Sequence, residues 1–419
     1  MDLDIKTTIV EQAAKAKQAA KKLALLSSAE KNKALYAMAH ALETKTPTIL
    51  KANTIDMENG RQKGLSAAVL DRLLLTTERI VQMADGLRQI AALNDPVGNG
   101  IMSHRRPNGL DIRCIRVPLG LIGIVYEARP NVTADAIGLC LKSGNAVILR
   151  GGSEAITSNK ILSSILADAA YSAGIPEGAI QFVSITDHSA VDVMMRLNKY
   201  IDVIIPRGGA GLIKRVVENS SVPVIETGVG ICHIYIDDKA DTNMATKIII
   251  NAKTTRPAVC NSVETVLIHQ NIADEFLPKL CDSLKEHKVE IRGCEKCRQI
   301  CPDLKQATDE DWATEYGDLI LSVKIVADIT EAIDHINTFG SGHSEAIITD
   351  SYQNALSFQQ NVDAAAVYVN ASTRFTDGNE FGFGAEIGIS TQKLHARGPM
   401  GLEALTTMKY LIYGEGQIR

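Results

Sequence analysis

The chain lacks several features that would place it in other classes of protein. Its 419 residues contain no run of about 18 uninterrupted apolar residues, so we expect no membrane-spanning helix. The opening residues lack the apolar core of a secretory signal peptide. The formal net charge is −5, which argues against wholesale nucleic-acid binding and leaves a local basic site as the alternative. There is also no repeat at a period of about 20–50 residues and no low-complexity linker.

Two nucleotide-binding motifs are absent as well. No G-x-x-x-x-G-K-[ST] occurs, which argues against a P-loop nucleotidase, and the glycines do not fit G-x-G-x-x-G. Eight cysteines in a chain of this length, without an export signal, favour a reducing cytoplasm over a disulfide scaffold. The length allows two or more domains at roughly 100–200 residues each.

The hydrophobic periodicity predicts an α/β protein. The first ninety or so residues read as helices, including segments at 9–26, from Ser28, and at 66–93. Short apolar strands then alternate with helices, and the expected strands of this first series are 121–126, 146–149, 179–183, 202–205 and 222–225. A second alternating series follows up to residue 369. This rhythm predicts two parallel sheets with helices on both faces.

The segment between the helical region and the first strands has a different pattern of apolar and polar residues. Residues 111–117 alternate between apolar and polar, and 104–109 before them have turn chemistry. This pattern predicts a projecting ribbon suited to oligomerisation, or an ordinary surface hairpin.

Cys260 is the first candidate for chemistry. It follows a basic run that contains Lys253 and Arg256, and an apolar strand at 266–268 comes after it. A thiol becomes a nucleophile when it ionises, and nearby cations favour ionisation. Arg256 is also placed to meet an anionic substrate. The alternative is a small buried hydrophobic residue.

Three glycine-containing turns follow predicted strands. The turn with Gly208 and Gly209 leads into a helix, so its backbone N–H groups are suited to phosphate, although a plain tight turn is the alternative. The turn from Arg150 to Glu154 offers a guanidinium and the Ser153 hydroxyl to a ribose or its phosphate. Glu226 directly follows the third strand and is a base, a cofactor contact or a solvated carboxylate.

Two further clusters attract attention near the carboxyl end. Arg374 and Arg397 lie in glycine-rich loops and are suited to an anion, with ordinary loops as the alternative. Cys294, Cys297 and Cys301 are spaced as one close pair plus one thiol, whereas zinc sites usually have two separated pairs. We therefore expect no metal site. On a helix, Cys297 and Cys301 would share one face, so plain packing is one interpretation, and the role of the cluster stays open.

The motifs together resemble the aldehyde dehydrogenase superfamily. The resemblance rests on the cysteine after Arg256-Pro257, on residues 226–230 and on the order of the turns. More narrowly, residues 126–133, 251–257, 369–378 and 381–401 resemble the γ-glutamyl phosphate reductases. The match covers nearly the whole chain.

This resemblance implies a domain organisation, a cofactor and a substrate. It implies a cofactor-binding domain at 1–94 and 119–228, a catalytic domain at 229–402, and a β flap for oligomerisation at 95–118 and 403–419. NADPH is the implied hydride donor and γ-L-glutamyl phosphate the implied substrate, in the second step of proline biosynthesis. A homo-oligomer and functional coupling with glutamate 5-kinase are the expected partnerships.

The family's residues carry over by position. Cys260 becomes the nucleophile that forms a thioester, and Asn131 the amide that stabilises the oxyanion. Arg150, Ser153, Gly208, Gly209, Glu226 and Glu315 fall on the cofactor side. The usual Lys-Pro pair is replaced by Arg150-Gly151 and a further glycine, which leaves the choice between NADPH and NADH open. A hydrolytic aldehyde dehydrogenase, in which Glu226 activates water, is the alternative function, and a thiol or metal-binding protein without catalysis is a third.

Overall fold

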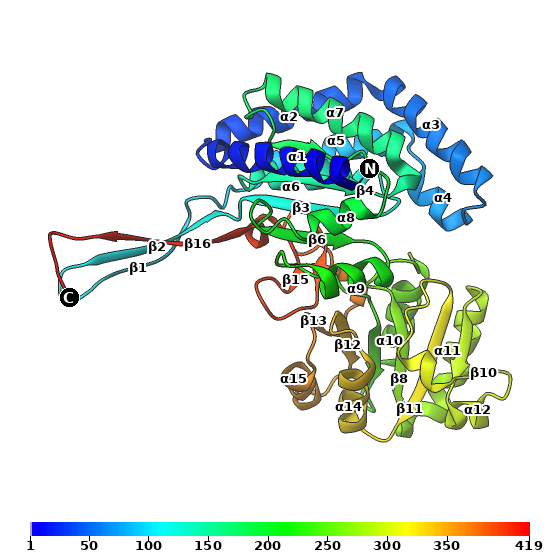
Figure 1. Ribbon diagram of the computed structural model, residues 1–419. Coiled ribbons are helices and arrows are strands. Elements are labelled where there is room, and N and C mark those ends of the chain that lie inside the picture. The colour runs from blue at the N-terminus through cyan, green and yellow to red at the C-terminus, as the bar shows by residue number, and fades with distance from the viewer. Residues whose placement is uncertain (1) are drawn as a thin grey trace. The chain divides into compact units, whose positions relative to one another are not determined.

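The computed structural model describes residues 2–419 and forms two compact units (Figure 1). The first unit comprises residues up to Thr227 together with Gly382–Gly388 and Met400–Arg419. The second comprises Gly228–Phe381 and Ile389–Pro399. Each unit is built on a parallel sheet covered by helices, so the predicted α/β class is confirmed.

The first unit contains a four-stranded parallel sheet in the order β5-β4-β3-β6. Its strands are β3 (Leu121–Tyr126), β4 (Ala146–Gly151), β5 (Ile180–Phe182) and β6 (Val203–Arg207), and the helices that connect or follow them are α6 (Asn131–Lys142), α7 (Ile156–Ser172), α8 (Ser189–Met194) and α9 (Ala210–Asn219). Strands β3 and β4 are buried along their whole length, which explains their continuous apolar runs. The chain moves outward from β3 to β5 and then returns to β6 on the other side of β3. Ligands usually bind at the carboxyl ends of parallel strands near such a reversal of strand order.

Five helices precede this sheet: α1 (Asp2–Leu23), α2 (Ser28–Thr44), α3 (Thr46–Gln62), α4 (Ala67–Leu73) and α5 (Thr77–Ala92). The cap of α2 is Ser27 and not Ser28, because the Ser27 hydroxyl accepts the Glu30 N–H while the Glu30 carboxylate accepts the Ser27 N–H. The expectation of one long helix at 66–93 is wrong. Thr76 caps α5, and Arg79 donates to the carbonyl of Leu74, so the chain turns between α4 and α5.

The first unit also carries a three-stranded antiparallel ribbon (Figure 1). Its strands are β1 (Gly100–Arg105), β2 (Asp111–Pro118) and β16 (Thr406–Tyr413). The strand expected at 111–117 is thus observed, but it is not exposed as expected: most of its residues are half-buried, Cys114 is buried and only Arg113 is exposed. Met408, Tyr410 and Ile412 alternate along β16 and are more than half exposed.

The second unit contains a seven-stranded parallel sheet in the order β10-β9-β11-β8-β7-β12-β13. Its strands are β7 (Cys232–Ile236), β8 (Val263–His269), β9 (Glu290–Gly293), β10 (Lys305–Gln306), β11 (Ile320–Val326), β12 (Ser344–Ile348) and β13 (Ala366–Val369), and its helices are α10 (Thr242–Thr254), α11 (Gln270–Glu286), α12 (Glu295–Ile300), α13 (Asp309–Trp312), α14 (Ile329–Phe339) and α15 (Tyr352–Asn361). Successive residues of a strand point to opposite faces. Ile234 and Ile236 therefore pack with α10 and α11, whereas Tyr235 between them packs with α14 and α15.

One expected strand is not formed. Residues 222–225 make only a single bridge, between Val224 and Ile204 of β6. Pro223 has no N–H to donate, which limits regular pairing in so short a segment. The remaining short elements are β14 (Ile389–Ser390), β15 (Gly398–Pro399) and the 3₁₀ helices η1 (Ser153–Ala155), η2 (Thr373–Phe375) and η3 (Leu402–Leu405).

Candidate functional site

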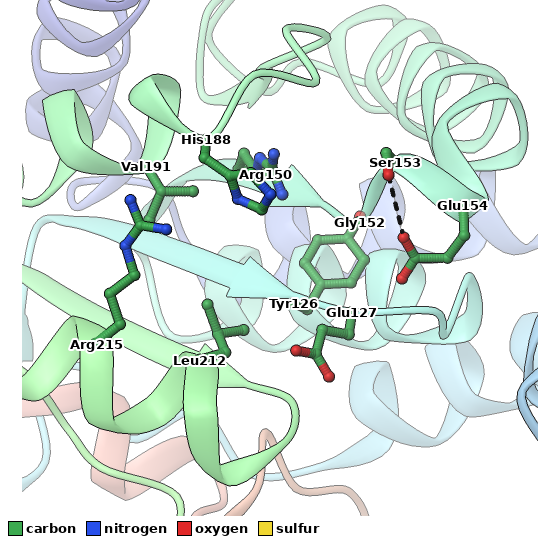
Figure 2. Close-up of a pocket in the computed structure, with 10 residues that line it drawn as sticks. All are labelled: Tyr126, Glu127, Arg150, Gly152, Ser153, Glu154, His188, Val191, Leu212 and Arg215. Carbon is green, nitrogen blue, oxygen red and sulfur yellow. Dashed lines mark hydrogen bonds between the residues drawn. The ribbon is translucent and has the colours of Figure 1, made fainter.

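A pocket in the first unit opens at the carboxyl ends of β3 and β4 (Figure 2). Its lining residues come from both strand ends, from η1, from α8 and the residues before it, and from α9, and they are Tyr126, Glu127, Arg150, Gly152, Ser153, Glu154, His188, Val191, Leu212 and Arg215. Two residues chosen from the sequence, Arg150 and Ser153, are thus brought together. His188 and Arg215 add two more nitrogen-bearing side chains that the sequence did not indicate.

Arg150 is held by backbone and is nearly buried. Its Nη2 donates to the carbonyl of Thr186 at 2.8 Å, and only 6% of the residue is exposed. Burial lowers the pKa of Arg150, and the nearby Glu154 carboxylate opposes that shift. The Nε of Arg150 is buried and has no hydrogen-bond partner among residues 2–419. A polar ligand in this pocket would find an unused donor there.

Arg215 lies on α9 and is oriented by a carboxylate of α8. Its Nη2 lies 2.9 Å from both oxygens of Asp192. Ser153 is exposed, and its hydroxyl lies 3.5 Å from Glu154. The pocket lining therefore combines basic groups with the carboxylates of Glu127 and Glu154 and with the Ser153 hydroxyl. Such a set fits phosphate and ribose oxygens.

The glycine turn before α9 is occupied by a side chain of the same unit. The Gly209 N–H donates to Oε2 of Glu127 at 2.8 Å. A Cβ at Gly208 would lie 2.6 Å from the Glu127 carboxyl carbon, so a side chain here would require the Glu127 carboxylate to move. An anionic ligand at this turn would have to displace the Glu127 carboxylate.

Two further predicted residues lie elsewhere in the first unit. Asn131 is the first residue of α6 and is exposed, with its amide 3.4 Å from Asp135. Burial raises the pKa of Asp135 to about 6, and the contact with Asn131 opposes this effect. Glu226 is half-buried and follows the bridge segment at 222–225.

Cys260 lies in the turn between α10 and β8 of the second unit. It therefore sits at the amino end of the sheet, beside the start of β7. The Cys232 thiol donates to the Cys260 carbonyl at 3.2 Å. A Cβ on Gly230 would lie 1.6 Å from that carbonyl oxygen, so only glycine fits there. The segment that contains Gly230 and precedes β7 therefore packs against the backbone of Cys260.

The next residue ties the cysteine to a distant loop. The Asn261 side-chain amide donates to the carbonyls of Arg374 and Thr376 at 3.2 and 2.9 Å. Thr373 in turn donates its hydroxyl to the Asn261 carbonyl at 2.7 Å. Residues 113 positions apart are therefore held in a fixed relation, and Arg374 is placed near Cys260.

Arg374 interacts electrostatically with Arg256, Cys260 and Asp377. Burial lowers the pKa of Arg374, the positive charge of Arg256 lowers it further, and a Cys260 thiolate acts in the opposite direction. The Nε of Arg374 is buried and has no hydrogen-bond partner among the residues that the structure describes. Two guanidinium groups and a thiol therefore share one environment in the second unit.

Lys253 does not supply the free charge that its sequence position suggested. It is fully buried, and its Nζ lies 2.6 Å from Glu264 and 3.0 Å from the carbonyl of Val263. Burial raises the pKa of Glu264 to about 7, although the Lys253 ammonium opposes that rise. This ion pair joins the end of α10 to β8. The Lys253 ammonium is therefore not a free cation that could act on the Cys260 thiol.

The two remaining predicted residues have protein partners. Glu315 is exposed, and its carboxylate accepts the Gly230 N–H at 3.1 Å. Arg397 forms an ion pair with Asp363 at 2.8 Å. Glu315 is thus bonded to the segment that packs beside Cys260. Arg397 is instead paired with Asp363.

The structure adds positioning residues that sequence reasoning missed, namely Glu127, His188, Arg215, Gly230, Cys232, Asn261 and Thr373. Asn261 had a signal in its position beside the cysteine. The others become neighbours only through the fold. Within residues 2–419, no helix is long and apolar enough to cross a membrane, and no three His, Cys, Asp or Glu side chains are arranged to hold a metal ion.

Comparison with known proteins places this arrangement in a family. The model of the aldehyde dehydrogenase family matches residues 4–311 and 312–411. The chain belongs to the aldehyde dehydrogenase family. It is therefore an oxidoreductase of a family that uses nicotinamide cofactors.

More closely similar proteins carry a narrower name. The chain is 60% identical over 417 residues to "Gamma-glutamyl phosphate reductase" of Halothermothrix orenii, covering 100% of both chains, and 62% identical over 405 residues to the protein of that name from Moorella thermoacetica, covering 97% of both. The crystal structure of γ-glutamyl phosphate reductase from Thermotoga maritima matches with a TM-score of 0.96 and 51% identity, over 98% of this chain and 99% of that one. The chain's place within the family is with the γ-glutamyl phosphate reductases.

A more distant structure shares the fold alone. An acetylating aldehyde dehydrogenase from Geobacillus thermoglucosidasius matches with a TM-score of 0.73 at 19% identity, over 100% of this chain and 99% of that one.

Proposed function

We propose that the chain reduces γ-L-glutamyl phosphate to L-glutamate 5-semialdehyde and phosphate with NADPH, as the second step of proline biosynthesis. The observation that carries the proposal is the Cys260 thiol beside Arg256 and Arg374, in a chain about 60% identical to proteins of that name. A nucleophile next to two guanidinium groups suits an acyl donor with two anionic ends.

The chemistry on the protein would proceed through Cys260. The thiolate attacks the γ-acyl carbonyl, the C–O bond to phosphate breaks, and phosphate leaves as the thioester forms. NADPH, when bound, supplies the hydride that reduces the thioester. The thiohemiacetal oxyanion then collapses, releases the semialdehyde and regenerates the thiolate.

The oxyanion needs donors that are in place before charge develops. We assign this role to the backbone N–H of Cys260 and to the side-chain amide of Asn131. One such donor contributes roughly 3–4 kcal/mol to transition-state stabilisation in other enzymes. The packing of Gly230 and the bonds of Asn261 fix the backbone that carries the first donor.

The substrate's phosphate and α-carboxylate are assigned to Arg256, Arg374 and Arg397. Arg374 is the strongest candidate because its Nε is buried without a protein partner and its loop is bound to Asn261. Arg256 is exposed in the turn before Cys260. Arg397 would have to exchange its partner Asp363 for the substrate.

We assign the cofactor to the pocket of the first unit and to its glycine turn. Arg150 and Ser153 would contact the adenosine ribose or its 2′-phosphate, and Gly208 and Gly209 the pyrophosphate. The unused Nε of Arg150 supports a polar ligand in this pocket. We place Glu226 and Glu315 on the nicotinamide side. Hydrolysis is not needed in this direction, so Glu226 need not act as a base.

The units have corresponding roles in this proposal. Residues 1–94 and 119–228 bind cofactor, 229–402 carry the catalytic machinery, and 95–118 with 403–419 form the flap that joins a homo-oligomer. The exposed apolar side chains of Met408, Tyr410 and Ile412 support an oligomerisation role. None of the eight cysteines, all within residues 2–419, forms a disulfide, which supports a cytoplasmic enzyme. Coupling with glutamate 5-kinase would deliver the labile acyl phosphate.

The reverse reaction separates this function from hydrolytic oxidation. Glutamate semialdehyde and NADP⁺ should yield NADPH only when inorganic phosphate is present, because phosphate must cleave the thioester. Equal turnover without phosphate would instead identify a hydrolytic aldehyde dehydrogenase that uses Glu226. Cys260→Ser should lose more than about 95% of the phosphate-dependent activity, since a hydroxyl is a far weaker nucleophile near neutral pH.

A further inference from the structure

Four thiols gather in the second unit without a role in the proposed reaction. Cys294 and Cys297 flank the start of α12, Cys301 follows its end, and Cys281 lies on α11. All four pack into or against the apolar cluster on one face of the sheet. All are free, and no group of three His, Cys, Asp or Glu side chains within residues 2–419 could hold a metal ion.

The closest pair is Cys294 and Cys297. The Cys294 Sγ lies 3.5 Å from the Cys297 Sγ. A disulfide needs about 2.05 Å between sulfurs, so the two sulfur atoms must approach each other by roughly 1.5 Å to form one. The second pair is Cys281 and Cys301, where burial raises the pKa of Cys281 to about 12 and Cys301 acts in the same direction.

The two thiols of the close pair differ in access. Cys297 is fully buried, and its thiol donates to the Val323 carbonyl at 3.4 Å. Cys294 is half-buried, and the two residues that follow it, Glu295 and Lys296, are exposed. The contact with Cys297 lowers the pKa of Cys294 to about 5, and the same contact raises that of Cys297. Of the two thiols, Cys294 is therefore the more exposed and the more readily ionised, whereas Cys297 is buried.

We propose that Cys294 and Cys297 form a redox-active dithiol that reacts with low-molecular-weight disulfides. The Cys294 thiolate attacks one sulfur of the small disulfide, the S–S bond breaks, and one small thiolate leaves. The Cys297 sulfur then attacks Cys294 in the mixed disulfide, and the second small thiolate leaves with the Cys297 proton. The protein dithiol is oxidised by two electrons, and one small disulfide is reduced to two thiols.

This site is separate from the nucleophile of the proposed reaction. Strand register places Gly293 beside Val323 in β11, and Val323 beside Val266 in β8. Cys294 thus follows a strand end at the level of Val266. Cys260 precedes the amino end of β8, three residues before Val263. The two thiol sites lie at different levels of the same sheet.

The test uses full-length Cys260→Ser protein, which removes the proposed catalytic thiol. After incubation with oxidised glutathione, alkylation and non-reducing digestion, mass spectrometry should find a peptide with Cys294 linked to Cys297. Adding Cys297→Ser should trap glutathione on Cys294 as a stable mixed disulfide. The serine hydroxyl keeps a donor for Val323, so this variant is expected to fold. Cys281→Ser/Cys301→Ser in the same background is the matched control and should still form the link.

Three results would overturn the proposal. The first is the absence of both the 294–297 link and the Cys294 adduct after treatment with oxidised glutathione. The second is a link that joins only Cys281 and Cys301. The third is one zinc ion per chain in protein purified without chelator, because the thiolates would then be ligands.

Discussion

Replacing Arg374 by alanine should weaken use of the substrate far more than binding of the cofactor. The guanidinium lies in the loop that Asn261 binds, near Cys260 and Arg256, and its Nε has no protein partner within residues 2–419. A hydrogen bond to a charged group contributes roughly 1.5–3 kcal/mol. At about 1.4 kcal/mol per factor of ten, kcat/KM for the acyl donor should fall by one to two orders of magnitude.

The assay is phosphate-dependent NADP⁺ reduction with glutamate semialdehyde, with KM measured separately for phosphate and for semialdehyde. Arg374→Lys keeps the charge but loses the planar fork, so we expect it to lie between wild type and alanine. Arg397→Ala serves as a comparison, because Arg397 is already paired with Asp363 and should have the smaller effect. Loss of NADPH binding with an unchanged KM for both substrates would refute the assignment of Arg374.

Three further outcomes follow from particular contacts. Gly230→Ala should lower kcat at least tenfold, because its Cβ would lie 1.6 Å from the Cys260 carbonyl oxygen. Gly211→Ala, which meets no atom within 4 Å, should leave kcat unchanged. Glu127→Gln should tighten NADPH binding about twofold to fivefold by fluorescence titration, since it removes an exposed negative charge from the glycine turn; weaker binding would contradict this. Burial lowers the pKa of His335 to about 3, so the unfolded chain binds this proton more readily below pH 6.5. The protein's free energy of unfolding, measured by urea titration, should therefore fall by up to about 2 kcal/mol as the pH is lowered from 6.5 to 5. The fall should be smaller in the His335→Gln variant.

Much of the fold could be predicted because local patterns agree with it. The buried runs of β3 and β4 are continuous, and helices such as α11 and α14 bury apolar residues at helical spacing. The failures have local causes. The break before Thr77 depends on a bond from Arg79 to a carbonyl five residues away, and the apolar residues at the break continue the helical pattern. The segment at 222–225 has a strand's composition, but it makes only one bridge.

The sequence by itself determined which residue types could perform the chemistry. A cysteine after a basic run, glycine turns after strands and arginines in polar loops can all be read along the chain, because each is a local pattern. Tertiary structure decided which of them share a site. It paired Lys253 with Glu264 and Arg397 with Asp363, and it placed Arg374 beside Cys260. Whether a charged side chain has an ion-pair partner depends on residues that can lie more than a hundred positions away in the chain. No local pattern in the sequence encodes such a partner.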